Sequence, residues 1–534
     1  MFPTGIADLH LDRRAFLKGA LSAGLIIPGL PLARAEPGRV RFKTYPFTLG
    51  IASGDPASDG FVIWTRLAPE PLRGHGGMPP DPVEVSWEIA SDAEMKGIVR
   101  TGTAIARIET AHSVHVEVDG LEPGRPYFYR FRAGDVDSPI GRAKAFAAAG
   151  SDVSELKFAS AGCQSWEDGF YTVWRHIAEE QFDFVFHYGD YIYEYARRSS
   201  DKSDRPIARA MPADFLLCVN LVDYRRRYGL YKSDPDLQAA HASCAFLSSF
   251  DDHEIANNWA GESDPRNTPP EAFLFRRAAA FQAWYEHMPV RRAVLPRGPD
   301  MLAYRSFRFG KLANLAVLDT RQFRSRQPCG DRIKPSCDEA RDPARTMMGQ
   351  IQENWLAGSL HSAEATWQIL AQQVLFAPMD WRSFPWAKTT ETAGNMDGWD
   401  GYVAGRDRVL AMLGEARAAN CVVLTGDAHI GLALEIKEKS QQPDSRCVGV
   451  EFLATSISSG GDGSALLQND AALRADNPHL KFAGNERGYN RHILNSKQWQ
   501  ADFRVVERIS TAGEPVITRK SLVVEAGNPG LVDA

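Results

Sequence analysis

Apolar and polar residues alternate with a period of two from about residue 47 to residue 148. The segments "VEVSWEIAS", "HVEVDGL" and "PYFYRFRAG" are separated by clusters of Gly, Pro and Asp. This pattern predicts antiparallel strands with one buried face. Within "LEPGRPYFYRF", Tyr127 has the spacing of the tyrosine corner of fibronectin type III-like sandwiches. We therefore predict a β-sandwich domain over residues 45–148, with His112 and His115 on its surface and a linker over residues 147–155.

From residue 156 onward the pattern changes to strands that alternate with helices. Helical periodicity runs through "FYTVWRHIAEEQ", "DFLLCVNLVDYRRRYGLY" and "FRRAAAFQAWYEHMP", and apolar strand patterns include "LANLAVLD", "TWQILAQQVL" and "CVGVEFLATSIS". The alternation predicts an α/β sandwich with helices over its sheets, occupying residues 155–534. The C-terminal runs "RVVERIS" and "VITRKSLVVEAG" are again strand-like and are predicted to close one edge of a sheet.

Four short polar motifs follow apolar, strand-like runs in this second region. Cys163 follows "LKFASAG", "GDYIY" follows "FDFVFHY", "DDHE" follows "CAFLSSF", and "GDAH" follows "CVVLT". Each motif alone is more typical of a turn, because Gly and Asp are common turn residues. Strands of an α/β sheet present functional groups at their carboxyl ends, so the four motifs together indicate one cleft.

The side chains in these motifs are metal ligands of mixed character. Phenolate and thiolate favour iron, whereas carboxylates favour calcium or manganese. Asp251 and Asp252 are neighbours, and two carboxylates at a buried strand end need a cation or a raised pKa to coexist. The set predicts a dinuclear or larger metal site.

The order of Cys163, "GDYIYEY", "DDHEIANN" and "GDAH" resembles the PhoD-type alkaline phosphatases and phosphodiesterases. The segments "SGDPASDGFVIWTRL" upstream and "LDTRQFRSRQPCGD" between the motifs carry the same resemblance, which spans nearly the whole mature chain. That family is similar to the purple acid phosphatases of the metallophosphatase superfamily. The resemblance implies a metallophosphatase-type α/β sandwich and an exported hydrolase of phosphate esters. It also implies a metal-activated hydroxide at a centre of ferric iron and one or two calcium ions.

The resemblance also assigns roles to individual residues. Asp190 is the expected bridging ligand, and Gln372 is the nearest counterpart of a metal-binding His of the purple enzymes. His253 is the expected general acid, with metal binding or a supporting hydrogen bond as the alternative. The metal ligands it implies are Cys163, Asp190, Tyr193, Asp252, Asp427 and His429.

Two further groups of residues have open interpretations. Arg321 and Arg324 follow a strand and are candidates for a bidentate phosphate clamp, although a salt-bridge role is the alternative. In "GWDGYVAGR", three residues are candidates for the cleft entrance, with packing as an equal alternative: Trp399, Tyr402 and Arg406.

Composition and the N-terminus indicate an exported enzyme. The length of 534 residues predicts two domains. The net charge of −6 argues against nucleic acid as a partner. Arg13 and Arg14, an apolar stretch and "ARA" at residues 33–35 match a twin-arginine signal peptide over residues 1–35. We expect the twin-arginine translocase as an export partner, a periplasmic or secreted mature protein, and no transmembrane anchor.

The seven cysteines have different predicted roles. Cys329 and Cys337 lie in the loop "QPCGDRIKPSC", where a disulfide is favoured over two free thiols. Cys163 is assigned to the metal, and the remaining four are predicted to be small buried apolar residues.

Three functional hypotheses follow. The leading one is an exported alkaline phosphatase or phosphodiesterase, and both monoester and diester substrates fit it. The second is a phospholipase D-like diesterase acting on lipid or cell-wall phosphodiesters, which an apolar lid near the cleft would favour. The third is a periplasmic metal-binding or ligand-binding protein without catalysis.

Overall fold

The computed structural model describes residues 41–534 except 197–206, 362–363, 416–419, 441 and 443. The predicted signal peptide over residues 1–35 lies outside the described residues. Among the helices that are described, none combines the length and the apolar character needed to cross a membrane.

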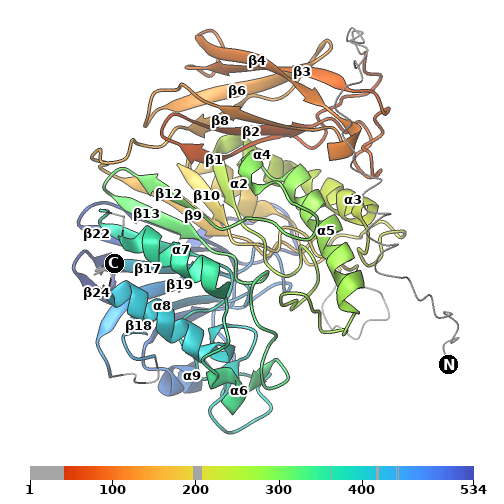
Figure 1. Cartoon of the computed structure of the whole chain (residues 1–534). Coiled ribbons are helices and arrows are strands. Elements are labelled where there is room, and N and C mark those ends of the chain that lie inside the picture. Colours follow the sequence, from red (N-terminus) through yellow and green to blue (C-terminus); the bar gives the residue numbers. More distant parts are fainter. Residues whose placement is uncertain (1–40, 197–206, 362–363, 416–419, 441, 443) are drawn as a thin grey trace, which may run out of the picture. The chain divides into compact units, whose positions relative to one another are not determined.

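The predicted β-sandwich is present near the N-terminal end of the described chain (Figure 1). One sheet has the order β4-β3-β6-β7, with β8 also paired to β6, and the facing strands are β1, β2 and β5. Tyr127 forms the predicted tyrosine corner, because its hydroxyl accepts a hydrogen bond of 2.9 Å from the backbone N–H of Glu122. The strands are β1 (Ile51–Ala57), β2 (Gly60–Arg66), β3 (Val83–Ala90), β4 (Ile98–Ala106), β5 (Ser113–Val118), β6 (Pro126–Ala133), β7 (Val136–Asp137) and β8 (Gly141–Lys144).

The surface prediction for the two histidines of this region is wrong for His112, which is fully buried, and His115 is also in contact with the second region. His115 Nε2 lies 2.9 Å from the carbonyl oxygen of Tyr285, and its ring stacks on the Tyr285 ring. His115 lies on β5, which contacts the α/β region, whereas His112 lies just before β5 and has its Nε2 3.3 Å from the carbonyl oxygen of Asp81. A period-two pattern alone does not reveal either contact.

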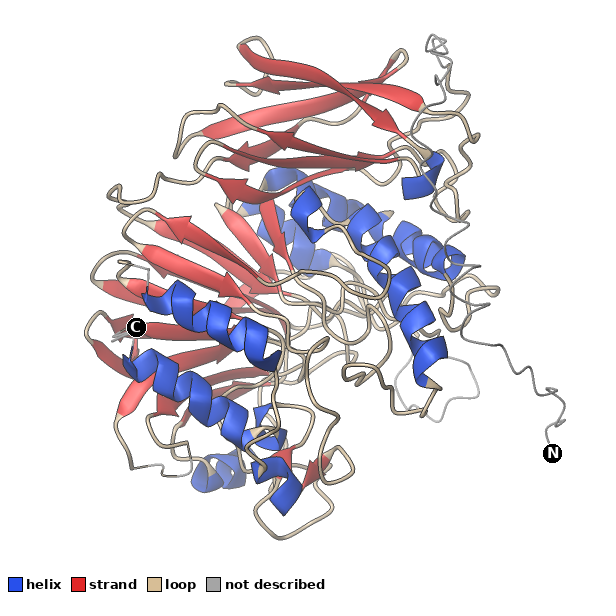
Figure 2. Cartoon of the chain, viewed as in Figure 1, coloured by secondary structure: helices blue, strands red, loops and turns tan. Residues whose placement is uncertain are grey.

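Two large mixed sheets form the α/β region (Figure 2). The ten-stranded sheet has the order β24-β23-β22-β21-β9-β10-β11-β1-β2-β5, so the sandwich strands continue this sheet through the parallel β1–β11 pair. The C-terminal strands form its other edge, as predicted. The strands not yet given are β9 (Leu156–Ala161), β10 (Phe184–His187), β11 (Ala245–Ser248), β21 (Arg487–Leu494), β22 (Gln498–Val506), β23 (Val516–Glu525) and β24 (Asn528–Asp533).

The seven-stranded sheet has the order β12-β13-β15-β17-β19-β18-β20, and the four strands from β13 to β19 in this order are parallel. A two-stranded ribbon pairs β14 with β16. The strands are β12 (Arg305–Phe309), β13 (Ala313–Val317), β14 (Ile333–Lys334), β15 (Trp367–Ala371), β16 (Gly394–Asn395), β17 (Cys421–Thr425), β18 (Gly431–Lys437), β19 (Cys447–Leu453) and β20 (Leu480–Gly484).

Alternate residues of the strands point into different apolar layers. Phe158 and Phe184 of the first sheet share a core with Ile369 and Val422 of the second, so the two sheets pack face to face. The opposite faces are covered by helices, α2 to α5 on the first sheet and α7 and α8 on the second. The helices are α2 (Thr172–Glu179), α3 (Leu221–Lys232), α4 (Pro235–Ser243), α5 (Pro270–His287), α6 (Asp338–Arg341), α7 (Gly349–His361), α8 (Val403–Glu415) and α9 (Asp470–Asp476).

The predicted disulfide between Cys329 and Cys337 is present. It encloses β14, which pairs with β16 just before Asp397. Cys218, Cys244 and Cys421 are buried free thiols, as predicted, whereas Cys447 is partly exposed.

Candidate metal centre

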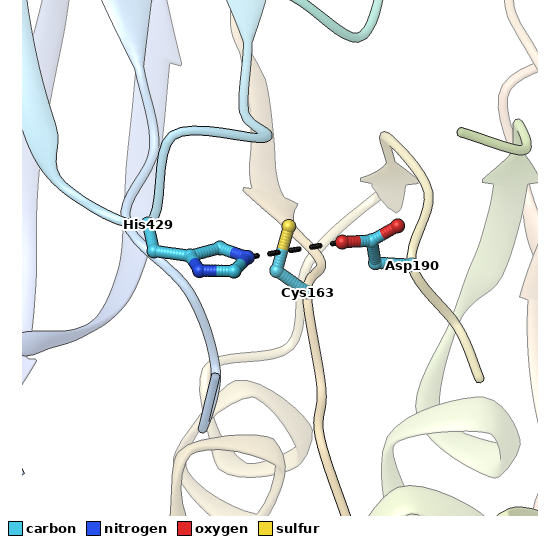
Figure 3. Close-up of side chains that lie close together, drawn as sticks. All are labelled: Cys163, Asp190 and His429. Atoms are coloured by element: carbon cyan, nitrogen blue, oxygen red, sulfur yellow. Dashed lines mark ion pairs between the residues drawn. The ribbon is translucent and has the colours of Figure 1, made fainter. Parts of the chain in front are cut away.

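The four motifs converge because their strands end at the same edge of the two packed sheets. Cys163, Asp190 and Asp251 follow β9, β10 and β11 of the first sheet, and Asp427 and His429 follow β17 of the second. Figure 3 shows Cys163, Asp190 and His429 pointing toward one another although they come from three different strand ends. The site is therefore built from residues that are far apart in the sequence and that share the carboxyl ends of their strands.

A first group of ligand atoms belongs to Cys163, Asp190 and His429, which lie within 4.8 Å of one another. His429 Nε2 is 3.8 Å from Asp190 Oδ2. The Tyr193 hydroxyl donates to Asp190 Oδ2 over 2.9 Å and lies 3.1 Å from His429 Nε2. Ser459 Oγ lies 2.5 Å from the same hydroxyl. Four of the six predicted metal ligands, Cys163, Asp190, Tyr193 and His429, therefore lie together.

Two further groups of ligand atoms adjoin the first. Asp190, Asp252 and His253 form one group, and Asp251, Asp252 and Asp427 form the other, again within 4.8 Å in each case. Asp190 is shared between two groups, which is the arrangement expected of a bridging carboxylate. Asp251 Oδ2 and Asp252 Oδ1 are buried and have no hydrogen-bond partner among the residues that the structure describes. Carboxylate oxygens left in this way are suited to a hard cation.

Burial and mutual repulsion disfavour the negative charges of this cluster. Burial, with the nearby carboxylates of Asp251 and Asp252, raises the pKa of Asp190 and that of Asp427 well above the usual range of a carboxyl group. Burial raises the pKa of Asp251 to about 6 although Arg321 opposes the shift. The pKa of the Cys163 thiol is raised by burial and by Asp190. Bound cations would reverse this balance, so the donor set fits metal ions in both chemistry and charge.

The backbone at the site is held in an uncommon conformation. Four of the predicted ligands have φ angles in the left-handed region: Cys163 at 52°, Asp190 at 54°, Asp427 at 64° and His429 at 59°. Such conformations are unfavourable for residues with a Cβ atom, and they persist where the surrounding structure imposes them. The loops are therefore shaped to direct these side chains inward.

Glu254 fixes two of the loops relative to each other. Its Oε2 accepts hydrogen bonds from the backbone N–H groups of Asp190 at 3.1 Å and Asp251 at 2.8 Å, and its Oε1 accepts from Tyr191 at 2.6 Å. Glu254 is fully buried. At Gly189 the loops approach so closely that a Cβ atom would lie 2.4 Å from the backbone nitrogen of Asp251. Glycine is required there because its φ of 130° is also unsuited to other residues.

His253 is positioned beside the first group of ligands. Its ring is 4.2 Å from the Tyr193 ring between centroids, and its Nδ1 is 2.7 Å from Glu194 Oε2. Although burial alone would lower the pKa of His253, the negative charges of Asp252, Asp190 and Glu194 raise it well above the ordinary value. A protonated imidazole is therefore favoured at this position as long as those carboxylates remain charged.

Arg321 and Arg324 lie behind the carboxylates, and both side chains are fully buried. Arg321 Nε, Nη1 and Nη2 are paired with Asp251 at 2.5 Å, Asp397 at 2.7 Å and Asp427 at 3.0 Å. Arg324 Nη2 also pairs with Asp397, at 2.7 Å. This arrangement favours ion pairing over a phosphate clamp as the role of Arg321 and Arg324. The ion pairs are buried and do not lie at the surface.

The residues considered for the cleft entrance have packing roles. Trp399, Tyr402 and Arg406 are at most 1% exposed. Trp399 Nε1 donates to Gln372 Oε1, and Gln372 Nε2 donates to the carbonyl oxygen of Val374. The side chain of Gln372 is therefore bonded to its surroundings in this structure.

Sequence reasoning missed several residues that organise the site. Glu194 and Glu254 lie inside the quoted motifs but had no assigned role. Their position next to predicted ligands in the sequence could have identified them as residues that support the site. Ser459 follows β19 in a Ser- and Gly-rich loop, which is a strand-end signal of the same kind as the four motifs. Asp397 had no such signal, because it lies beyond the two-stranded ribbon.

Comparisons with known proteins identify the family of the chain. The PhoD-like phosphatase family matches residues 158–503, and the N-terminal domain of PhoD-like phosphatases matches residues 33–147. The chain belongs to the PhoD-like phosphatase family. Alkaline phosphatase D of Bacillus subtilis (strain 168) is 44% identical over 525 residues, which cover 97% of this chain and 88% of that relative. A solved structure described as PhoD has a TM-score of 0.89, with 44% identity and coverage of 93% of both chains.

Membership of the PhoD-like family decides the class of activity. The chain is a phosphoric ester hydrolase of the alkaline phosphatase type, and its substrate is a phosphate ester. The alternative of a binding protein without catalysis is therefore not favoured.

We predict that Glu254→Ala lowers both the metal content and the free energy of unfolding, the latter by at least about 2 kcal/mol. Three buried N–H groups would lose their acceptor. Urea unfolding and elemental analysis measure the two effects. Glu254→Gln is the matched control, because its amide oxygen can still accept from Asp190 and Asp251, and its losses should be smaller. Wild-type stability and metal content in Glu254→Ala would show that the hydrogen bonds accepted by Glu254 are not needed to hold the two loops together.

Proposed function

We propose that this chain hydrolyses phosphate esters outside the cytoplasm at a centre of ferric iron and one or two calcium ions. The observation that carries the proposal is the sharing of Asp190 between a group with thiol, phenol and imidazole donors and a group with carboxylates. Soft and phenolic donors favour iron, and a set of carboxylate oxygens favours calcium. We also propose the division into a sandwich domain over residues 45–148 and a catalytic domain over residues 155–534.

Cys163, Asp190, Tyr193 and His429 would hold the iron. Asp252 and Asp427 would hold calcium, with Asp251 adjoining them in the same group of carboxylates. Bound there, these cations supply positive charge to the phosphate oxygens and lower the pKa of a coordinated water. Arg321 keeps the carboxylates close together by balancing part of their charge from behind.

The protein side chains then control access and proton transfer. Asp427 and His429 are the least buried members of the cluster, with side chains 21% and 30% exposed, so the substrate phosphate is expected to approach from their side. His253 uses Nδ1 to contact Glu194, which leaves Nε2 to donate a proton to the departing alcohol oxygen. Monoesters and diesters both satisfy this arrangement.

Export by the twin-arginine route, with a periplasmic or secreted destination, completes the proposal. We predict that Arg13→Lys combined with Arg14→Lys retains the protein in the cytoplasm, as measured by cell fractionation. Unchanged export of the double variant would contradict a twin-arginine signal.

We predict that Cys163→Ser removes the iron, the visible charge-transfer absorption of the iron centre and most of the activity. The reason is that a hydroxyl is a poor replacement for a thiolate ligand. Elemental analysis and the absorption spectrum measure this. Cys218→Ser is the matched control, since Cys218 is an equally buried free thiol in the layer between the first sheet and its helices. Wild-type iron content in Cys163→Ser would disprove the ligand assignment.

We predict that calcium chelation abolishes activity while iron is retained, and that added calcium restores the rate. The physical reason is the all-oxygen group formed by Asp251, Asp252 and Asp427, which suits calcium better than zinc. Phosphate release before and after chelation is the measurement. Recovery with zinc alone would place the site with the purple acid phosphatases instead.

We predict that His253→Ala slows esters of poorly acidic alcohols by about a hundredfold or more and nitrophenyl esters much less. The nitrophenolate leaves without a proton, so it does not need the acid. The metal content should stay unchanged. An equal loss on both substrates together with loss of a cation would identify His253 as a ligand.

A further inference from the structure

Glu194 makes the closest polar contact of the His253 side chain among the described residues. Its Oε2 lies 2.7 Å from His253 Nδ1, and both side chains are largely buried, at 3% and 8% exposed. The remaining oxygen, Oε1, accepts a hydrogen bond of 2.9 Å from the backbone N–H of Asn257. Both carboxylate oxygens of Glu194 therefore bind the segment that carries His253.

The aromatic neighbours restrict the remaining motion of the His253 ring. The ring lies beside Tyr193, at 4.2 Å between centroids, and meets Tyr195 edge-on at 5.5 Å. Both tyrosines belong to the same loop as Glu194. The backbone N–H of His253 also donates to Asp190 Oδ1, at 3.3 Å. One loop therefore sets the ring plane, the backbone and the Nδ1 contact of His253.

The loop that carries Glu194 is itself anchored. Arg227 on α3 is almost fully buried, and its Nη1 donates to the carbonyl oxygens of Tyr193 and Tyr195 on either side of Glu194. The backbone N–H of Cys218 donates to the carbonyl oxygen of Glu194 at 2.7 Å. These contacts fix the position of the Glu194 carboxylate.

A carboxylate in this position has a defined chemical effect. The carboxylate accepts a hydrogen bond from the Nδ1–H of the imidazole. The proton that is transferred to the leaving group must therefore be the one on Nε2. The carboxylate also stabilises the imidazolium before transfer and prevents the ring from rotating away. An amide in the same place can donate to Nδ1 and favour the opposite tautomer, in which Nδ1 is the acceptor.

We propose that Glu194 is a positioning residue for the general acid, which fixes the His253 ring so that its Nε2–H faces the leaving oxygen. This inference rests on the proposed function, because it assumes the acid role of His253. Glu194 acts only through His253 and does not itself contact the substrate.

The test compares Glu194→Gln, His253→Ala and the double variant on an alkyl phosphate and on nitrophenyl phosphate, in the metal-loaded protein. We expect Glu194→Gln to lower kcat on the alkyl ester at least about tenfold, because general acid catalysis contributes about a hundredfold or more. The rate on the nitrophenyl ester should change less than about threefold, and iron and calcium content should stay at wild-type levels. The double variant should be no slower on the alkyl ester than His253→Ala alone, since the two residues act as one unit.

A purely structural role would give a different result. It would lower both rates together, and its effect would add to that of His253→Ala. Glu353→Gln is the matched control, because Glu353 is also a buried glutamate, paired with Arg408 away from the metal ligands, and it should not change the ratio of the two rates.

The outcomes separate this inference from the proposed function. A selective loss in His253→Ala without one in Glu194→Gln would overturn the role of Glu194 alone. Equal losses on both esters in His253→Ala would overturn the acid role of His253, and the inference with it. Loss of a metal ion in Glu194→Gln would also overturn it, because Glu194 would then support a ligand.

Discussion

The concentration of negative charge at the junction of the two sheets is the constraint on which the site depends. Asp190, Asp251, Asp252 and Asp427 lie within a few side-chain lengths of one another, together with the Cys163 thiol. Buried like charges repel strongly unless positive charge is placed among them. Arg321 supplies part of that charge from behind, through pairs with three of the surrounding carboxylates. The remaining positive charge would come from bound cations.

The fold holds these groups together through its backbone. Strands β9, β10 and β11 of the first sheet and β17 of the second bring four loops together. The left-handed conformations at Cys163, Asp190, Asp427 and His429 turn the side chains toward a common point. Glu254 then joins two loops by accepting three of their N–H groups. A metal centre of this kind is pre-formed by the protein, because the loops would lose hydrogen bonds if they separated.

The sequence predicted the parts of the structure that depend on local pattern. Strand periodicity and strand-end motifs predicted the sandwich, the α/β sheets and the cluster of candidate ligands, because a strand that is buried on both faces can only place polar chemistry at its end. The pairing of β1 with β11 and the stacking of His115 on Tyr285 depend on contacts between regions, which no local pattern encodes. The role of Asp397 was also hidden, since it acts through Arg321 and Arg324 from a loop that is distant in the sequence.

The most direct test of a mixed iron and calcium centre is a crystal structure of the metal-loaded protein with anomalous scattering recorded on both sides of the iron absorption edge. The account predicts one iron peak in contact with Cys163, Asp190, Tyr193 and His429. It also predicts a separate, lighter cation beside Asp252 and Asp427 that shows no change at the iron edge. An iron peak that is absent, or one that lies away from Cys163 and Tyr193, would contradict the central claim.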